Sequence, residues 1–310
     1  MARTLPEAPA ALALRRDEPL DRHTYFRLGG PAAYFGEPAT IEDLHAIVDW
    51  ARSVDLPVRV LGGGSNVLVA DAGLTAVVLS LRHACGGITF EAERVTAGGA
   101  VMLPALARAA AAHDLGGLEF TIGIPGTVGG ALQSNAGIGD GRALGDLIES
   151  IDVLEDGEPR TLGRHQLAFE YRTTSLRDSG AIVLGSRLRL TPRPRAECET
   201  EMTRLLEARQ ASQPTAERNA GSIFRNPPGD YAGRLIDAAG CKGLAVGGAK
   251  VSEQHANFIV HDGAATAAEV ASLMLAVRAR VQSHAGVTLV PEVVWWGDGP
   301  PPTVFRGLAE

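Results

Sequence analysis

The chain has 310 residues, of which 45% are hydrophobic and 21% charged, a composition typical of a folded globular protein. Its net charge of −7 excludes a global positive field for nucleic acid, so an anionic ligand requires a local cluster of cations. No apolar run approaches the roughly 20 residues of a membrane-spanning helix, and Cys85, Cys198 and Cys241 lack metal-binding spacing. We expect a cytoplasmic protein with reduced thiols and no metal.

The first half of the chain predicts short strands and two helices. Residues 1–20 are expected to form a loose lead-in. A helix is predicted from Thr40, because Thr40 and Asp43 form a near capping box. Its buried face repeats at helical spacing, at Leu44, Ile47, Val48 and Ala51. Further strands are predicted at 76–81, 94–97, 151–154 and 181–190, with a helix near 103–113.

The second half predicts a linker followed by helices. The stretch "TPRPRAE" at 191–197 carries two prolines, which favours a linker. Helices are predicted near 199–211 and 230–239. A third begins at Thr266 with Glu269 completing a capping box, and Gly286 ends it. Its apolar face comprises Val270, Leu273, Met274, Val277 and Val281. The fold class predicted from these elements is α+β.

The stretch "VRVLGGGSNVLVADAG" at 58–73 predicts a strand, a glycine-rich turn and a second strand. A Rossmann fingerprint requires a helix after its glycines, and a Walker A loop requires Gly-Lys-Ser/Thr; neither is present. Successive backbone N–H groups of such a turn can converge on an anion, with Ser65 and Asn66 adding side-chain donors. The alternative is a tight hairpin turn that binds nothing.

A second glycine-rich stretch, at 116–141, carries apolar anchors that flexible linkers lack. These anchors are Leu118, Phe120, Ile122, Ile124 and Val128. A glycine-rich segment fixed in a core is suited to wrapping a large flat ligand, although an irregular buried loop is the alternative. Together the two stretches indicate a dinucleotide held without a Rossmann fold.

Two later motifs carry candidate chemistry. Ser222 lies in "AGSIFRNP", which does not match the GxSxG turn of a serine hydrolase, so it is either a functional or a turn-capping serine. Glu292 lies in "GVTLVPEVVWWG", where we expect it inside an apolar strand. A carboxylate there is costly unless it is paired or protonated. This makes Glu292 a functional candidate, with a structural ion pair as the alternative.

Several motifs along the chain together resemble those of a known family. In order, the chain contains "LGGGSNVLVAD", "GLEFTIGIPGTVGGALQSNAG", "YRTTSLR", "AGSIFRNP", "GGAKVSEQHANFIV" and "LVPEV". These motifs closely resemble UDP-N-acetylenolpyruvoylglucosamine reductase, a flavoenzyme of peptidoglycan precursor synthesis. The short spacing from Arg172 to Ser222 resembles the family's compact subgroup. One departure is Thr174, which stands where the family commonly has serine, with Ser175 following.

The resemblance implies a two-lobed FAD-binding domain of the vanillyl-alcohol-oxidase type and a C-terminal α+β domain that binds substrate. The expected boundaries are 21–192 for the FAD domain, with lobes of about 21–80 and 81–192, then 196–298 for the substrate domain and 299–310 for a tail. FAD is expected to bind non-covalently, with NADPH as hydride donor. The implied cofactor contacts are Leu61, Gly62, Gly63, Gly64, Ser65, Asn66, Gly123, Ile124, Pro125, Gly126, Thr127, Gly129, Gly130, Asn135, Ala136 and Gly137.

The resemblance also implies catalytic roles. Flavin-derived hydride would attack the enolpyruvyl methylene carbon, Ser222 would protonate the adjacent carbon, and Arg172 and a protonated Glu292 would stabilise the developing charge. The implied contacts with the UDP-sugar substrate are Tyr171, Arg225, Asn226, Lys250 and His255. His255 is equally suited to bonding a neighbouring loop. Two other classes stay open: a different FAD oxidase or dehydrogenase of the same fold, and a non-catalytic nucleotide-binding module.

Overall fold

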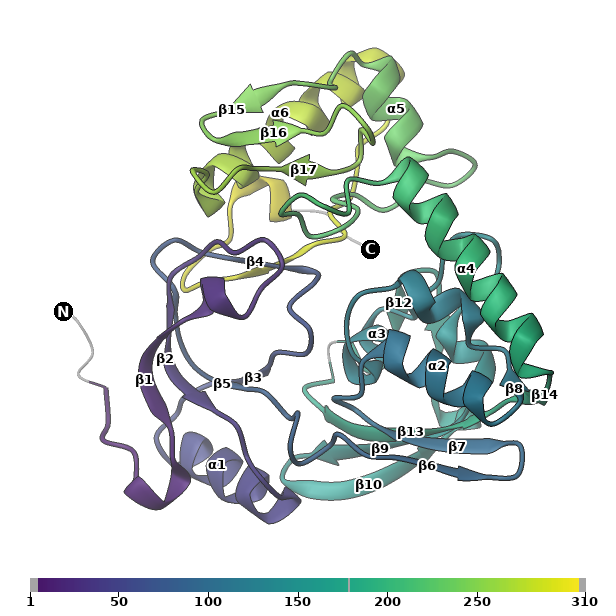
Figure 1. The fold of residues 1–310 in the computed structure, drawn as a ribbon. Helices are drawn as coiled ribbons and strands as arrows, with labels where there is room; N and C mark the ends of the chain where they lie inside the picture. Colours follow the sequence, from purple (N-terminus) through teal and green to yellow (C-terminus); the bar gives the residue numbers. More distant parts are fainter. Residues whose placement is uncertain (1–4, 178, 307–310) are drawn as a thin grey trace. The chain divides into compact units, whose positions relative to one another are not determined.

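The computed structural model describes residues 5–177 and 179–306, which divide into two compact units (Figure 1). Unit 1 comprises residues 1–15, 34–63 and 76–208, and unit 2 comprises residues 16–33, 64–75 and 209–310. Each unit therefore combines three separate pieces of chain. This division differs from the expected domain boundaries, because two early segments belong with the C-terminal part.

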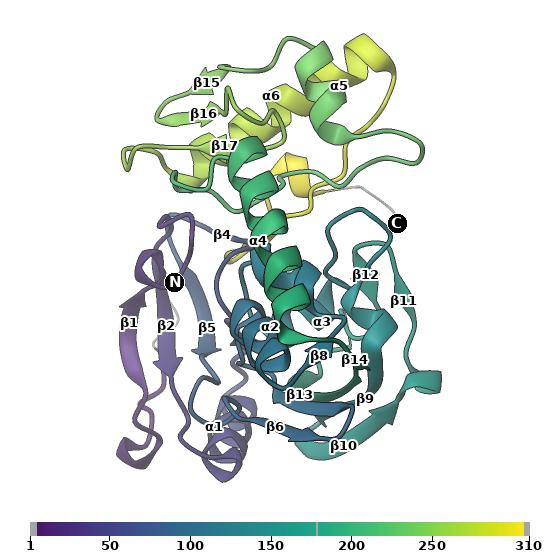
Figure 2. The ribbon, with the colours of Figure 1, turned by 45° about the vertical axis from the view of Figure 1, so that its right-hand side comes forward.

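A five-stranded antiparallel sheet forms the centre of unit 1. Its order is β10 (Glu158–Gly163), β9 (Ile148–Glu155), β13 (Ile182–Arg189), β7 (Arg94–Gly98) and β6 (Ile88–Glu91). Helices α2 (Leu103–Ala112) and α3 (Val128–Gln133) lie over one face of this sheet (Figures 1 and 2). The apolar anchors Leu118, Ile122 and Val128 are buried in the core between them, which confirms that the second glycine-rich stretch is fixed.

A four-stranded sheet has the order β1 (Arg15–Pro19), β2 (Pro31–Gly36), β5 (Leu74–Leu79) and β3 (Val58–Val60). The unit boundaries fall within β1, β2 and β5, so the chain passes from one unit to the other inside these strands. Helix α1 (Ile41–Ser53) follows β2. Its predicted capping box is present, with the Thr40 hydroxyl accepting from the Asp43 N–H and the Asp43 carboxylate accepting from the Thr40 N–H.

Unit 2 is built around helix α6 (Ala267–Ala285), which packs against the sheet of β15 (Ala245–Val246), β16 (Ala249–Val251) and β17 (Ile259–Val260), while α5 (Ala232–Ala238) packs beside it (Figure 2). The predicted cap is confirmed at both ends: Thr266 and Glu269 form the capping box, and Gly286 ends the helix in the left-handed region at φ 69°. Asp71 adds a second cap, its carboxylate accepting from the N–H groups of Ala267 (2.7 Å) and Ala268 (3.0 Å).

Strand β4 (Val67–Val69) pairs in parallel with β18 (Val294–Trp296) within unit 2. Strand β3, on the other side of the glycine turn, pairs instead with β5. The turn at 61–66 is therefore no hairpin, since its two strands belong to different sheets. The predicted order of strand, turn and strand is confirmed, and the hairpin alternative is excluded.

The expected linker at 191–197 is wrong. Thr191 and Pro192 form β14, which pairs with β8 (Leu115–Gly116), and helix α4 (Arg195–Ser212) begins three residues later. The Arg193 guanidinium donates to Glu119 at 2.9 Å. Proline composition favoured a linker, but the pairing depends on a strand almost eighty residues earlier, which local composition does not report.

The remaining short elements are the two-residue strands β11 (Phe169–Glu170) and β12 (Thr173–Thr174) and 3-10 turns at Ala10–Leu12, Leu20–Arg22, Glu119–Gly123, Leu144–Leu147, Arg164–Gln166 and Thr303–Phe305. The residues expected to be a loose lead-in therefore contain one 3-10 turn, the strand β1 and the start of a second turn. Within the described residues, no helix combines the length and apolar character needed to cross a membrane.

Candidate functional site

The two glycine-rich stretches meet backbone to backbone in unit 1. A Cβ atom added to Gly63 would lie 2.9 Å from the Gly126 Cα, and one added to Gly62 would lie 2.5 Å from the Thr127 Oγ1. Both approaches are closer than side chains allow, so glycine is required at both positions. Thr127 also caps α3, its Oγ1 accepting from the Gly130 N–H at 3.4 Å. A surface formed mainly by backbone fits the expected dinucleotide cradle.

The second half of the first stretch lies in unit 2. Gly64 has φ 64°, and a Cβ there would collide with the His23 carbonyl oxygen. The Asn66 Nδ2 donates to the Glu292 carbonyl oxygen at 3.1 Å, and the Val294 N–H donates to the Asn66 carbonyl at 3.0 Å. The sequence suggested that Asn66 donates to the ligand. The structure adds a contact that the sequence missed, which joins this stretch to the Glu292 segment.

Arg172 occupies the turn of a small hairpin in unit 1, between β11 and β12. Its backbone is in the left-handed region at φ 57°, and its guanidinium lies 5.5 Å from the centre of the exposed Tyr171 ring. Asn135 supports this hairpin: its Nδ2 donates to the Glu170 carbonyl at 3.0 Å, and its Oδ1 accepts from the Gly145 N–H at 3.0 Å. The motif that carries Arg172 is thereby tied to the second glycine-rich stretch.

The departure at Thr174 has a structural role. Thr174 is buried, and its hydroxyl accepts from the Leu176 N–H at 3.3 Å. The neighbouring Ser175 hydroxyl accepts from the Ala168 N–H at 3.2 Å. Both hydroxyls therefore take part in the local backbone of the hairpin.

Ser222 and Glu292 are brought together in unit 2 through one residue. The Ile223 carbonyl, directly after Ser222, accepts from the Glu292 N–H at 2.8 Å. Both side chains are half-buried. The expectation that Glu292 lies inside an apolar strand is wrong: β18 begins only at Val294, because Pro291 lacks an N–H and limits regular pairing to an isolated bridge with Phe224.

The candidate catalytic residues are divided between the units, with Arg172 in unit 1 and Ser222 and Glu292 in unit 2.

The candidate substrate-binding residues of unit 2 differ in their burial and in their hydrogen bonds. Asn226 accepts from the Ala232 N–H through its Oδ1 at 3.0 Å and so caps α5, a role that the sequence did not reveal. Lys250 is exposed on β16, and Arg225 is half-buried. His255 accepts from the Asn257 N–H through its Nδ1 at 3.2 Å. Burial, opposed by a backbone hydrogen bond and aided by the charge of Lys242, lowers the pKa of His255 below its ordinary value.

Asn257 is a functional candidate that sequence reasoning missed, although it lies in the quoted "HANFIV". Its buried amide bonds the backbone that follows Ser222. No local pattern marks an asparagine whose partner is more than thirty residues away.

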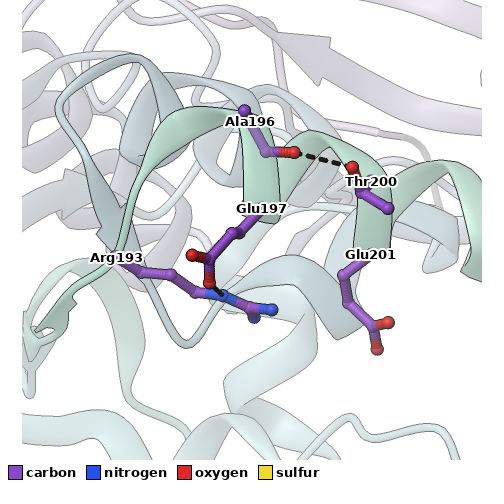
Figure 3. A pocket seen from close by; sticks show the side chains of 5 residues that line it. All are labelled: Arg193, Ala196, Glu197, Thr200 and Glu201. Atoms are coloured by element: carbon purple, nitrogen blue, oxygen red, sulfur yellow. Dashed lines mark hydrogen bonds and ion pairs between the residues drawn. The ribbon is translucent and has the colours of Figure 1, made fainter.

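An open hollow in unit 1 contains none of the candidate residues. It is lined by Arg193, Ala196, Glu197, Thr200 and Glu201 along the first turns of α4 (Figure 3). Arg193 bonds Glu197 at 3.5 Å, and the Thr200 hydroxyl donates to the Ala196 carbonyl at 2.7 Å. Among residues 5–177 and 179–306, no cluster of His, Cys, Asp or Glu is suited to a metal ion, and each cysteine is a buried free thiol.

Comparisons with known proteins support both halves of this arrangement. Residues 32–163 match the model of an FAD binding domain. Residues 213–296 match the C-terminal domain of UDP-N-acetylenolpyruvoylglucosamine reductase. These matches confirm the expected α+β fold with an FAD-binding part and a C-terminal part.

Relatives and a solved structure cover almost the whole chain. UDP-N-acetylenolpyruvoylglucosamine reductase 2 from Symbiobacterium thermophilum is 46% identical to this chain, over 93% of this chain and 93% of its own length. UDP-N-acetylenolpyruvoylglucosamine reductase from Moorella thermoacetica is 43% identical, over 93% of this chain and 95% of its own length. The crystal structure of the reductase from Thermus caldophilus is 38% identical, with a TM-score of 0.78 over 91% of this chain and 99% of that one. The chain belongs to the UDP-N-acetylenolpyruvoylglucosamine reductase family.

Proposed function

We propose that this chain reduces the enolpyruvyl group of UDP-N-acetylglucosamine enolpyruvate to a lactyl ether, giving UDP-N-acetylmuramate for peptidoglycan precursor synthesis. It is an FAD-dependent oxidoreductase of the family to which it belongs, and NADPH is its hydride donor. Its substrate is a small UDP-sugar.

The observation that carries this proposal is the bond between the Ser222 and Glu292 segments. Another FAD enzyme with the same cofactor fold would share the glycine-rich loops but would not need the "AGSIFRNP" and "LVPEV" motifs that this bond joins. The Glu292 N–H and the Ile223 carbonyl, 2.8 Å apart, fix the spacing between the two segments. This arrangement supports a proton donor beside a charge-stabilising group, which a non-catalytic module would not need.

The glycine-rich loops would hold FAD, with Gly62, Gly63, Gly126 and Thr127 forming the surface against which it lies. When bound, FAD supplies the hydride that adds to the methylene carbon of the substrate. The hydroxyl of Ser222 donates its proton to the adjacent carbon, a general-acid step worth roughly 10² to 10⁴ in rate. Arg172 would bind the substrate carboxylate, and a protonated Glu292 would stabilise the negative charge that develops there.

The net charge of −7 means that local cations must bind the substrate diphosphate. In unit 2, Arg225 and Lys250 are the charged candidates, and Asn226 and His255 are the polar ones; Tyr171 is a polar candidate in unit 1. The lowered pKa of His255 favours its neutral form at pH 7, so it would act by hydrogen bonding. The buried thiols and the need for NADPH favour a cytoplasmic location.

The test is a visible spectrum of the purified protein, followed anaerobically by NADPH and then by UDP-N-acetylglucosamine enolpyruvate. We expect flavin bands that bleach with NADPH and return when the substrate is added. A yellow protein whose reduced flavin is not reoxidised by this substrate would favour the alternative of another FAD oxidase or dehydrogenase. A protein that takes up no FAD would contradict the cradle assignment.

A further inference from the structure

The backbone that follows Ser222 is held by one buried residue, Asn257, which is 3% exposed and lies two residues before β17. Its Oδ1 accepts from the Phe224 N–H at 3.0 Å, and its Nδ2 donates to the Phe224 carbonyl at 2.8 Å. Its backbone carbonyl also accepts from the Ile223 N–H at 2.9 Å. A single asparagine therefore satisfies three backbone groups immediately after the candidate proton donor.

The same short segment bonds to the backbone around Glu292. The Ile223 carbonyl accepts from the Glu292 N–H at 2.8 Å, and the Arg225 N–H donates to the Val290 carbonyl at 2.9 Å. Phe224, between these two residues, forms its backbone bonds with the Asn257 side chain instead, as the alternation of an antiparallel pair requires. The segment is thus clamped between Asn257 and the run that carries Glu292.

Removing the Asn257 side chain would leave the buried N–H and carbonyl of Phe224 without their partners. A buried donor or acceptor left without a partner costs about 1–3 kcal/mol, so loss of the amide would favour a shift of Phe224 toward new partners. Such a shift would move Ser222 and Glu292 relative to each other, because Ile223 connects them. A displacement of about 1 Å at a reacting group can lower a rate by roughly 10².

We propose that Asn257 is a positioning residue whose buried carboxamide sets the spacing between Ser222 and Glu292. This inference rests on the proposed function, because it concerns the step in which reduced flavin passes its hydride to the substrate. Asn257 does not contact the reacting atoms in this scheme. Its influence is confined to substrate-dependent reoxidation, and reduction of the flavin by NADPH does not depend on it.

The first variant to test is Asn257→Leu, which keeps the number and branching of the side-chain heavy atoms and removes both bonds to Phe224. In stopped-flow experiments, we expect flavin content and NADPH reduction within about twofold of the unmodified protein. Reoxidation by UDP-N-acetylglucosamine enolpyruvate should slow on the order of 10²-fold. Unchanged reoxidation in Asn257→Leu would overturn the inference.

The matched control is Arg278→Met in α6. Arg278 donates to the Val304 carbonyl at 2.8 Å and to the Thr303 carbonyl at 3.1 Å, so this change also removes two side-chain bonds to backbone in unit 2. We expect a similar loss of stability with normal reoxidation. Equal slowing in both variants would reduce the role of Asn257 to general stability and overturn the proposal.

A second variant, Asn257→Asp, keeps the inference testable if the leucine variant fails to fold. A protonated aspartic acid reproduces the asparagine pattern, one acceptor for the Phe224 N–H and one donor for its carbonyl, whereas a carboxylate would face that carbonyl without a proton. The ionisable neighbours of this segment are His255, Arg225 and Glu292, and dividing the variant rate by the unmodified rate at each pH removes the pH dependence that the two proteins share. The reoxidation ratio should rise as pH falls from 9 to 6.

A ratio that does not change with pH would contradict the positioning role. The proposed function fails separately, since in that case the unmodified protein itself would not be reoxidised by the substrate.

Discussion

At the scale of single residues, the shared surface of the two glycine-rich stretches depends on the absence of side chains. Gly63 and Gly126 are so close that an added Cβ would lie 2.9 Å from the neighbouring Cα. The sequence indicated the cradle because glycine itself is the signal. It did not indicate Asn257 or the Asn66 bond to Glu292, because an amide that bonds a distant backbone group leaves no local pattern.

We predict that Gly63→Val lowers the flavin content of the purified protein by at least about tenfold, because a branched side chain would force residues 62–63 away from Gly126. The measurement is the absorbance ratio of bound flavin to protein. The control is Gly87→Val in the same unit, where an added Cβ meets no atom within 4 Å. Full flavin content in Gly63→Val would contradict the cradle.

We predict that Ser222→Ala binds FAD and is bleached by NADPH, while substrate-dependent reoxidation falls by roughly 10² to 10⁴. The physical reason is that only the hydroxyl group, and with it the donated proton, is removed, which leaves the Ile223 bonds to Asn257 and Glu292 intact. Stopped-flow absorbance separates the two half-reactions. If reoxidation kept its normal rate, Ser222 would not be the proton donor.

At the scale of elements, local signals predicted helices well and long-range pairing poorly. Helix α6 has its cap, its buried face and its terminal glycine in adjacent sequence, and each was confirmed. The segment at 191–197 has two prolines, but its structure depends on β8 and on Glu119. Glu292 was expected in a strand because its neighbours are apolar, whereas the proline before it delays β18.

The buried Glu119 accepts from Arg193, the residue directly after β14, and so joins that segment to the turn that leads into the cofactor stretch. Burial raises the pKa of Glu119. The backbone N–H groups of Glu119 and Gly117 and the charge of Arg193 lower it by more, so the pKa is below its ordinary value. A carboxyl group whose pKa is lowered by folding stabilises the protein above its unfolded pKa. This contribution is lost as pH falls through the folded pKa.

We predict that Glu119→Gln lowers the free energy of unfolding by about 1–2 kcal/mol at pH 7, since Arg193 is partly exposed and solvent weakens the pair. The difference from the unmodified protein should shrink as pH falls below about 4, where the carboxylate of the unmodified protein is also lost. Denaturant unfolding followed by circular dichroism measures both. The control is Glu199→Gln, which removes an exposed ion pair with Arg195 and should change the free energy of unfolding little. A pH-independent difference for Glu119→Gln would contradict the argument.

At the scale of the whole molecule, unit 2 is assembled from three pieces of chain. Its core includes Phe26, Leu28 and Leu68 from the two early segments, together with the C-terminal residues. The expected domain at 196–298 came from the family resemblance and from the two prolines at 191–197, and neither signal assigns the early segments to the same unit.

We predict that a fragment of residues 196–298 alone does not fold cooperatively, because it lacks those core side chains and the strand that pairs with β18. Thermal unfolding by circular dichroism and the dispersion of amide signals by NMR test this, with the full chain as the control. A sharp thermal transition in the fragment would show that the early segments are dispensable for its fold.

The pairing of β4 with β18 has a consequence for synthesis on the ribosome. Val67 emerges early, and its partner Val294 is added only near the end of the chain. At about 5–20 residues per second, the apolar strand Val67–Val69 waits on the order of ten seconds or more with open edges. Translation that stops before residue 294 would release a chain in which this edge stays open, next to the glycine turn. Such a product would be a target for chaperones or proteases, so pairing of β4 with β18 distinguishes chains that have been made as far as residue 296 from shorter ones.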